Sequence, residues 1–199
     1  MSCSPYIIDG GILAGGLARR MNGLDKGLQL FQDQAMAYWV AKALAPQVRN
    51  VVINCNRHLS DYKKISPFVV PDTLADYPGP LAGILSLLEF SDADYLLISP
   101  CDTPLLDSGF AKLMRSHLSH ALMANSNTPP LFAAKVGDKY QPLHLCIAKE
   151  YKTSIANFLN SGNQRVMQWM EENKVHWLEF PKSDPSFKNI NTLDDILNA

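Results

Sequence analysis

The sequence predicts an α/β protein, built as a single domain on a mostly parallel sheet with helices on both faces. Short apolar runs rich in β-branched residues alternate with amphipathic segments along the first 120 residues. Residues 95–99 are apolar almost without a break, as is typical of a strand covered on both faces. No linker, repeat or low-complexity segment divides the 199 residues, and we expect one domain over 1–199.

The first half follows this alternation closely. An apolar run at 6–8 resumes at Ile12 and Leu13, which predicts a first strand that ends in a glycine turn. Further strands are expected at 51–53, 68–70 and 95–99, with helices at 34–44, 81–90 and 108–118, the last capped by Ser108.

The second half is less regular. Strands are expected at 122–124, 131–136, 143–148 and 175–180, and antiparallel pairing among them is open. Helices are expected at 150–160 and 165–172, separated by Gly162, and Thr192 would cap a final short helix.

Polar residues follow the four expected strands of the first half. The glycine loop follows the first strand, and Asn54, Asp72 and Asp102 follow the next three. Ligands of parallel sheets bind beyond the carboxyl ends of the strands, near a reversal of strand order. We therefore expect these four loops to meet at one cleft.

The loop after the first strand combines glycines with cations. Gly15 and Gly16 allow close approach of backbone amides to a ligand, and Arg19, Arg20 and Lys26 follow. Backbone donors beside cations suit a polyphosphate. The loop matches neither common phosphate-binding motif, so a tight turn with a solvated basic face stays as the alternative.

Composition narrows the function classes. The formal net charge is −1, which argues against a nucleic-acid or membrane-surface partner. No apolar stretch approaches the ~18 residues that span a bilayer, and no signal peptide is visible. The four cysteines are widely spaced, which favours reduced thiols over a disulfide framework or a zinc site. We expect a cytoplasmic protein and a monomer.

Five blocks of sequence, in order along the chain, carry a resemblance to a known family. They are Leu13-Ala-Gly-Gly-x-x-x-Arg-Met-x-Gly-x-Asp-Lys26, Asn54-Cys-Asn-Arg-His58, Asp72-Thr-Leu-Ala-Asp-Tyr-Pro-Gly-Pro-Leu-Ala-Gly83, Pro100-Cys-Asp-Thr-Pro104 and Asn189-Ile-Asn191-Thr192. Together they resemble the molybdopterin nucleotidyltransferases, and most closely the guanylyl-transferring members. One departure is Asn22, where the family usually has glycine.

The resemblance implies a fold like that of the nucleotide-diphospho-sugar transferases, a Rossmann-type sandwich. It implies transfer of GMP from GTP to the phosphate of molybdenum-bearing molybdopterin, with Mg²⁺ as cofactor. Residues 1–120 would then form a nucleotide-binding half and 121–199 a pterin-substrate half. Transient contact with molybdoenzymes or their chaperones is also implied.

Site roles follow from the same resemblance. Lys26, Arg19 and Asp102 would be catalytic, and Asp102 would bind the metal. GTP contacts are implied at Leu13, Ala14, Gly15, Gly16, Lys26, Asn54, Asp72, Gly79, Gly83 and Asp102. The pterin would be bound by Arg165, Asn189 and Asn191.

Other interpretations stay open beside it. From its own spacing Asp102 suits a turn cap as well as Mg²⁺. Asn54 and Asp72 suit ordinary loop turns. A cytidylyltransferase on the same pterin, a sugar-phosphate nucleotidyltransferase and a non-catalytic nucleotide or cofactor carrier are the alternative functions. Gly15 and Gly16 resemble the guanylyl branch, because the cytidylyl branch usually has Leu-Ala-Ala-Gly here.

Overall fold

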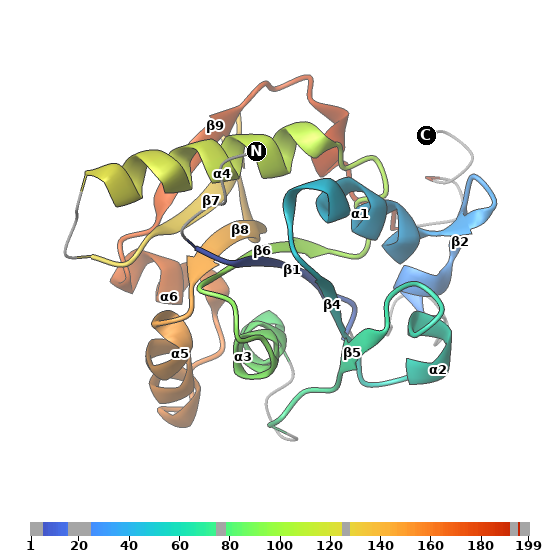
Figure 1. Ribbon diagram of the computed structural model, residues 1–199, viewed down its shortest axis with the longest axis horizontal. Coiled ribbons are helices and arrows are strands. Elements are labelled where there is room, and N and C mark those ends of the chain that lie inside the picture. The colour runs from blue at the N-terminus through green and yellow to red at the C-terminus, as the bar shows by residue number, and fades with distance from the viewer. Residues whose placement is uncertain (1–5, 16–24, 75–78, 125–127, 192–194, 196–199) are drawn as a thin grey trace.

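A seven-stranded sheet runs through the middle of the molecule, and helices cover both of its faces (Figure 1). The computed structural model describes residues 6–15, 25–74, 79–124, 128–191 and 195. Gly16, Arg19, Arg20, Asn22 and Thr192 lie outside these described residues, and so do the expectations that concern them.

The strand order confirms a mostly parallel sheet. The order across the sheet is β5-β4-β1-β6-β8-β7-β9, and β8 alone runs antiparallel to its neighbours. The strands are β1 (Ile8–Leu13), β4 (Val51–Asn54), β5 (Phe68–Val70), β6 (Tyr95–Pro100), β7 (Leu131–Val136), β8 (Lys139–Ala148) and β9 (His176–Phe180). A separate hairpin pairs β2 (Leu30–Phe31) with β3 (Gln34–Ala35).

The helices form two layers around this sheet. In Figure 1, α1 and α4 lie above the sheet, and α3 and α5 lie below it. The α-helices are α1 (Met36–Leu44), α2 (Leu59–Tyr62), α3 (Pro80–Phe90), α4 (Ser108–Met123), α5 (Tyr151–Asn160) and α6 (Val166–Glu172). Short 3-10 helices are η1 (Lys26–Leu28), η2 (Ala45–Gln47) and η3 (Pro185–Phe187).

Apolar side chains of the strands and helices make the core between these layers. Ile12, Ile53 and Leu97 are fully buried in the central strands, as their position between two helical layers requires. Trp169 of α6 is the largest fully buried side chain of the described residues.

The register of the parallel strands aligns their carboxyl ends. Leu13 of β1 pairs with Asn54 of β4 and with Pro100 of β6, and Asn54 also pairs with Val70 of β5. The loops after these four strands therefore leave the sheet at one edge. Because β4 lies on one side of β1 and β6 on the other, this edge contains the reversal of strand order.

Three local predictions were wrong. The strand expected at 122–124 does not form, because α4 continues to Met123. The helix expected from Gln34 begins at Met36, since Gln34 and Ala35 pair with β2 in a hairpin. The cap of α4 is Asp107 rather than Ser108, and its carboxylate accepts a hydrogen bond from the Gly109 amide.

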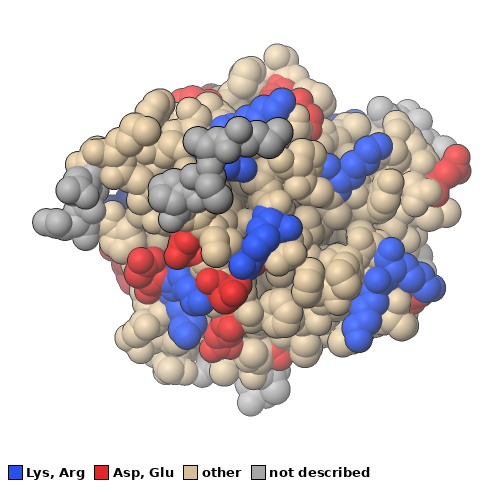
Figure 2. Space-filling view, in the orientation of Figure 1, with Lys and Arg blue, Asp and Glu red and all other residues tan. Residues whose placement is uncertain are grey.

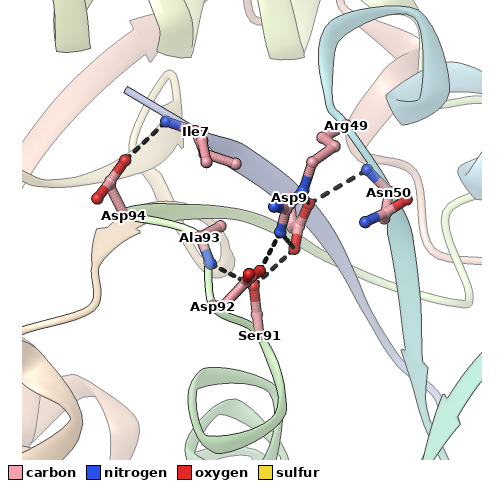
Figure 3. A network of polar contacts seen from close by, with 8 residues as sticks. All are labelled: Ile7, Asp9, Arg49, Asn50, Ser91, Asp92, Ala93 and Asp94. Atoms are coloured by element: carbon pink, nitrogen blue, oxygen red, sulfur yellow. Dashed lines mark hydrogen bonds and ion pairs between the residues drawn. The ribbon is translucent and has the colours of Figure 1, made fainter. Parts of the chain in front are cut away.

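The opposite, amino edge of the sheet carries a closed polar network (Figure 3). Asp9, in β1, is 2 % exposed and is bound by both Nε and Nη2 of Arg49, at 3.0 and 2.8 Å. The Ser91 hydroxyl donates at 2.6 Å and the Asn50 amide at 3.2 Å. Arg49 also pairs with Asp92. These contacts raise the pKa of the Arg49 guanidinium and tie the starts of β1, β4 and β6 together.

On the face shown in Figure 2, acidic and basic side chains are interspersed. Among the described residues, no helix is both long and apolar enough to cross a bilayer.

Candidate active site

A lysine–aspartate pair stands at the carboxyl edge of the sheet. Nζ of Lys26 lies 2.8 Å from Oδ2 of Asp102, which follows β6. Both side chains are partly exposed, at 28 % and 17 %. Nζ also donates to Oδ1 of Asn191 at 2.5 Å. Residues from three distant parts of the sequence therefore meet at one point.

The C-terminal segment is fixed to the Asp102 loop by its backbone as well. The Ile190 amide donates to the Asp102 carbonyl oxygen at 2.8 Å. Lys26 is the side-chain partner that the described residues give the Asp102 carboxylate, through Oδ2. The turn-cap interpretation of Asp102 stays open beside it.

A second cluster lies where β4 and β5 end. Nδ2 of Asn54 donates to Oδ1 of Asp72 at 2.9 Å, and Nδ2 of Asn56 donates to Oδ2 at 2.7 Å. Oδ1 of Asn56 accepts the Asp72 amide at 2.8 Å. Two amide groups thus hold the Asp72 carboxylate in one orientation.

Two glycines make room for this cluster. A Cβ placed on Gly83 would lie 2.5 Å from Oδ1 of Asn54, and one on Gly15 would lie 3.1 Å from the same atom. Any larger residue at 83 would displace Asn54. Gly79, which precedes α3, has open space around it instead.

The end of β1 joins the two clusters. The Leu13 carbonyl oxygen accepts the Cys101 amide at 3.0 Å, and the Ala14 amide donates to the Asn54 carbonyl oxygen at 2.8 Å. Leu13 and Ala14 therefore lie between the Asp102 loop and the Asn54 loop. In the described part of the chain, the residues at the ends of the four parallel strands do lie together, as their positions predict.

The three residues assigned to the pterin are not all together. Asn191 contacts Lys26, and Asn189 is exposed two residues earlier. Arg165 is exposed immediately before α6, and its side chain makes no hydrogen bond or ion pair with the other residues that the structure describes. Gly16 and Arg19, assigned to GTP and catalysis, lie outside the described residues.

Buried polar groups support the loops from below. Tyr62 donates to Oδ1 of Asp25, whose carboxylate also accepts the Gly27 amide at the start of η1. Burial raises the pKa of the Cys55 thiol to about 12 and also raises that of Cys101, so both thiols stay protonated.

A further buried polar contact involves the residue after Asp102. The Thr103 hydroxyl lies 3.3 Å from Nε2 of His144. Burial lowers the pKa of His144 to about 3.

Sequence reasoning missed two of these residues. Asn56 lies inside a block that carried the family resemblance, and its two-residue spacing from Asn54 places both amides at the end of one strand. Tyr62 gave no signal, because a tyrosine in a short amphipathic helix is ordinarily a core residue.

The side chains available as metal ligands decide how a metal ion could bind at this edge. No group of three or more His, Cys, Asp or Glu side chains in the described part of the chain could hold a metal ion. Asp102 offers a single carboxylate at an open edge, already paired with a cation. Mg²⁺ is commonly held by one or two carboxylates together with substrate phosphates and water, so Asp102 fits that mode of binding.

A mostly parallel sheet whose polar loops gather where the strand order reverses defines a doubly wound α/β protein with a ligand-binding edge. The chain belongs to the family of the MobA-like NTP transferase domain, whose model matches residues 10–176.

Relatives and solved structures agree with this assignment. The chain is 35 % identical over 185 residues to a molybdenum cofactor guanylyltransferase of Haemophilus influenzae, covering 93 % of each chain. It is 36 % identical to one of Shewanella sediminis, covering 93 % of this chain and 91 % of the relative. A crystal structure of molybdopterin-guanine dinucleotide biosynthesis protein A from Archaeoglobus fulgidus superposes with a TM-score of 0.70 at 21 % identity, over 96 % of this chain and 95 % of that one.

Proposed function

We propose that the protein transfers GMP from GTP to the terminal phosphate of molybdenum-bearing molybdopterin, which yields the guanine dinucleotide cofactor and pyrophosphate. The names of the relatives support this substrate pair. The structural observation that carries the proposal is the Lys26–Asp102 pair at the carboxyl edge, joined to Asn191. A cation and the carboxylate proposed to hold the metal thus lie beside Asn191, which is assigned to the pterin.

The reaction needs positioning more than proton transfer. A phosphate oxygen of the pterin attacks the α-phosphorus of GTP, a new P–O bond forms, and the bond to the β-phosphate oxygen breaks. The nucleophile is already an anion, so no protein base is required. The residues must hold two anions in line and offset their repulsion.

Lys26 would leave Asp102 to bind the triphosphate and the departing pyrophosphate, and Arg19 would assist it. Asp102 would hold Mg²⁺, which when bound neutralises charge on the phosphate oxygens.

The second cluster suits the guanine base. The amide nitrogens of Asn54 and Asn56 each donate to one oxygen of the Asp72 carboxylate, which is half-buried and keeps further lone pairs to accept from a ligand. Guanine presents adjacent N–H donors, and such acceptors match them. Leu13, Ala14, Gly15 and Gly83 would bring backbone close to the nucleotide, and Gly16 and Gly79 would flank it. Arg165, Asn189 and Asn191 would bind the pterin.

The test measures pyrophosphate release from purified protein with molybdenum-bearing molybdopterin, with GTP and CTP offered in parallel, with and without Mg²⁺. We expect release with GTP alone, and only when Mg²⁺ is present. Release with CTP alone would make the protein a cytidylyltransferase. Release only when a sugar phosphate replaces the pterin would identify the sugar-phosphate alternative. GTP binding without release from any acceptor would favour a carrier.

The proposal extends to the location, oligomeric state and partner proteins of the chain. We propose a cytoplasmic monomer that contacts molybdoenzymes or their chaperones transiently when it hands on the cofactor. Size-exclusion chromatography with light scattering tests whether the protein is a monomer in solution.

A further inference from the structure

The hydroxyl group of Tyr62 lies beneath the two loops that carry Lys26 and Asp102. Tyr62 is the last residue of α2 and is fully buried. Its hydroxyl donates to Oδ1 of Asp25 at 2.5 Å. Burial is the main cause that raises the pKa of Tyr62, so the phenol keeps its proton and acts as a donor.

On the Lys26 side, this hydrogen bond fixes the residue that caps η1. Oδ1 of Asp25 also accepts the Gly27 amide at 3.2 Å, and the Asp25 carbonyl oxygen accepts Nε2 of Gln29 at 3.0 Å. Lys26 is the first residue of the turn so formed. The orientation of the Asp25 carboxylate therefore sets where the Lys26 side chain leaves the backbone.

On the Asp102 side, the contact runs through Gly27 and Cys101. A Cβ on Gly27 would overlap the Tyr62 hydroxyl and lie 3.2 Å from both Cβ and Sγ of Cys101. Tyr62, Gly27 and Cys101 are thus packed against one another. Cys101 immediately precedes Asp102 and is tied to β1 through its amide.

We propose that Tyr62 is a positioning residue that fixes the loop that carries Lys26 relative to the loop that carries Asp102 for nucleotidyl transfer. This inference rests on the proposed function. The hydroxyl touches neither side chain directly, but it contacts the Lys26 loop at Asp25 and Gly27, and Gly27 in turn lies against Cys101 of the Asp102 loop. Misplacement of a catalytic group by about 1 Å can cost about a hundredfold in rate, so a support of this kind affects turnover.

The test compares Tyr62→Phe with Tyr151→Phe. Tyr151 is also buried, and its hydroxyl donates to the Pro129 carbonyl oxygen at 2.9 Å, away from the carboxyl edge. Each variant loses one hydroxyl and its hydrogen bond, which is buried for Tyr62 and part-buried for Tyr151. In pyrophosphate release well below the melting temperature, we expect kcat of Tyr62→Phe to fall about tenfold or more, with a smaller change in KM for GTP. Tyr151→Phe should keep the wild-type kcat. Equal kcat values for the two variants would overturn the proposal.

A second readout does not depend on activity. The Lys26 ammonium is held by Asp102 and Asn191, so a small amine-acylating reagent should modify it slowly. We expect Tyr62→Phe to speed its modification severalfold, measured by mass spectrometry of the Lys26 peptide, and Tyr151→Phe to leave it unchanged. An unchanged rate in Tyr62→Phe would overturn the positioning role even if the wild type proved inactive with GTP.

If Tyr62→Phe does not fold, Asp25→Asn replaces it. This isosteric change weakens the same hydrogen bond from the acceptor side, because the carboxylate oxygen becomes part of a neutral amide. It should shift both readouts in the same direction. A wild-type kcat together with a wild-type rate of Lys26 modification in Asp25→Asn would refute the inference.

Discussion

The two edges of the sheet use the same kinds of side chain in different ways. At the amino edge, the Asp9 carboxylate is buried and accepts four hydrogen bonds, from Arg49, Ser91 and Asn50. At the carboxyl edge, the Asp102 carboxylate is partly exposed, and Lys26 is its side-chain partner among the described residues. One carboxylate has its acceptor capacity filled, and the other keeps most of it available.

This difference separates polar groups that stabilise the fold from those suited to a ligand. Removal of a group from a filled network leaves buried partners unsatisfied, which costs stability. Removal of a group from an open pair costs little stability but alters what the edge can bind.

The largest effect is expected for Asp102→Asn. If Asp102 holds Mg²⁺ as proposed, pyrophosphate release should fall by about a thousandfold or more. The free energy of unfolding in urea should change by less than about 1 kcal/mol, because the lost ion pair is partly exposed. Near-normal turnover would refute the metal role of Asp102.

The reciprocal change is Asp9→Asn. It breaks the paired hydrogen bonds to Arg49 in a buried network, and we expect a loss of about 2–3 kcal/mol in the free energy of unfolding. Turnover per folded molecule should stay at the wild-type level. Asp61→Asn is the matched control, because it removes an exposed ion pair with Lys64 and should leave the free energy of unfolding at the wild-type value.

The pH dependence of the free energy of unfolding tests the role of His144, which lies against Thr103, the residue after Asp102. Burial holds the pKa of His144 at about 3, below the value of about 6.5 in an unfolded chain. Between these values the unfolded chain binds a proton that the folded chain does not, so stability falls as the pH falls. From pH 7 to pH 5 this histidine should account for a loss of about 2 kcal/mol.

Urea unfolding of His144→Phe and of the wild type at pH 7 and pH 5 measures how much of the stability loss is due to His144. Phenylalanine suits the aromatic surroundings of Phe110 and Phe187, and it cannot bind a proton. The pH 7 value gives the combined effect of the altered packing and the lost contact with the Thr103 hydroxyl. An equal loss of stability in the variant and the wild type between the two pH values would show that His144 is not the group responsible.

The smallest effect is expected for Asn56→Ala. It removes one of two amides that orient Asp72, and we expect KM for GTP to rise about fivefold, equivalent to about 1 kcal/mol. Gln168→Ala removes an amide–carboxylate hydrogen bond of the same kind on the surface of α6 and should leave KM unchanged. Equal KM values in both variants would show that Asn56 does not act on the nucleotide.

Much of this edge could be predicted from sequence because the signals are local. The polar residue after each apolar run marks a strand end, and parallel pairing then places Asn54, Asp72 and Asp102 at one edge. The same logic failed at 122–124, since a three-residue apolar run does not distinguish a strand from the last turn of a helix. It also missed the β2–β3 hairpin, whose turn residues Gln32 and Asp33 adopt positive φ without a glycine.

Contacts between distant segments could not be predicted. Nothing near Tyr62 indicates that its hydroxyl meets Asp25, and nothing near Asn191 indicates Lys26 as its partner. Both contacts depend on how loops from separate strands pack together, which no periodicity encodes. The family resemblance assigned roles to Lys26 and Asn191 separately, but only the structure joins them.

The Lys26–Asn191 contact also has a consequence for synthesis of the chain. The two residues are 165 positions apart, whereas β1, β4, β5 and β6 are complete once Pro100 has been made. Because a chain emerges from the ribosome N-terminal end first, the parallel strands can pair long before Asn191 is available. A nascent chain can therefore hold a nearly finished sheet while its Lys26 ammonium still lacks the partner at Asn191.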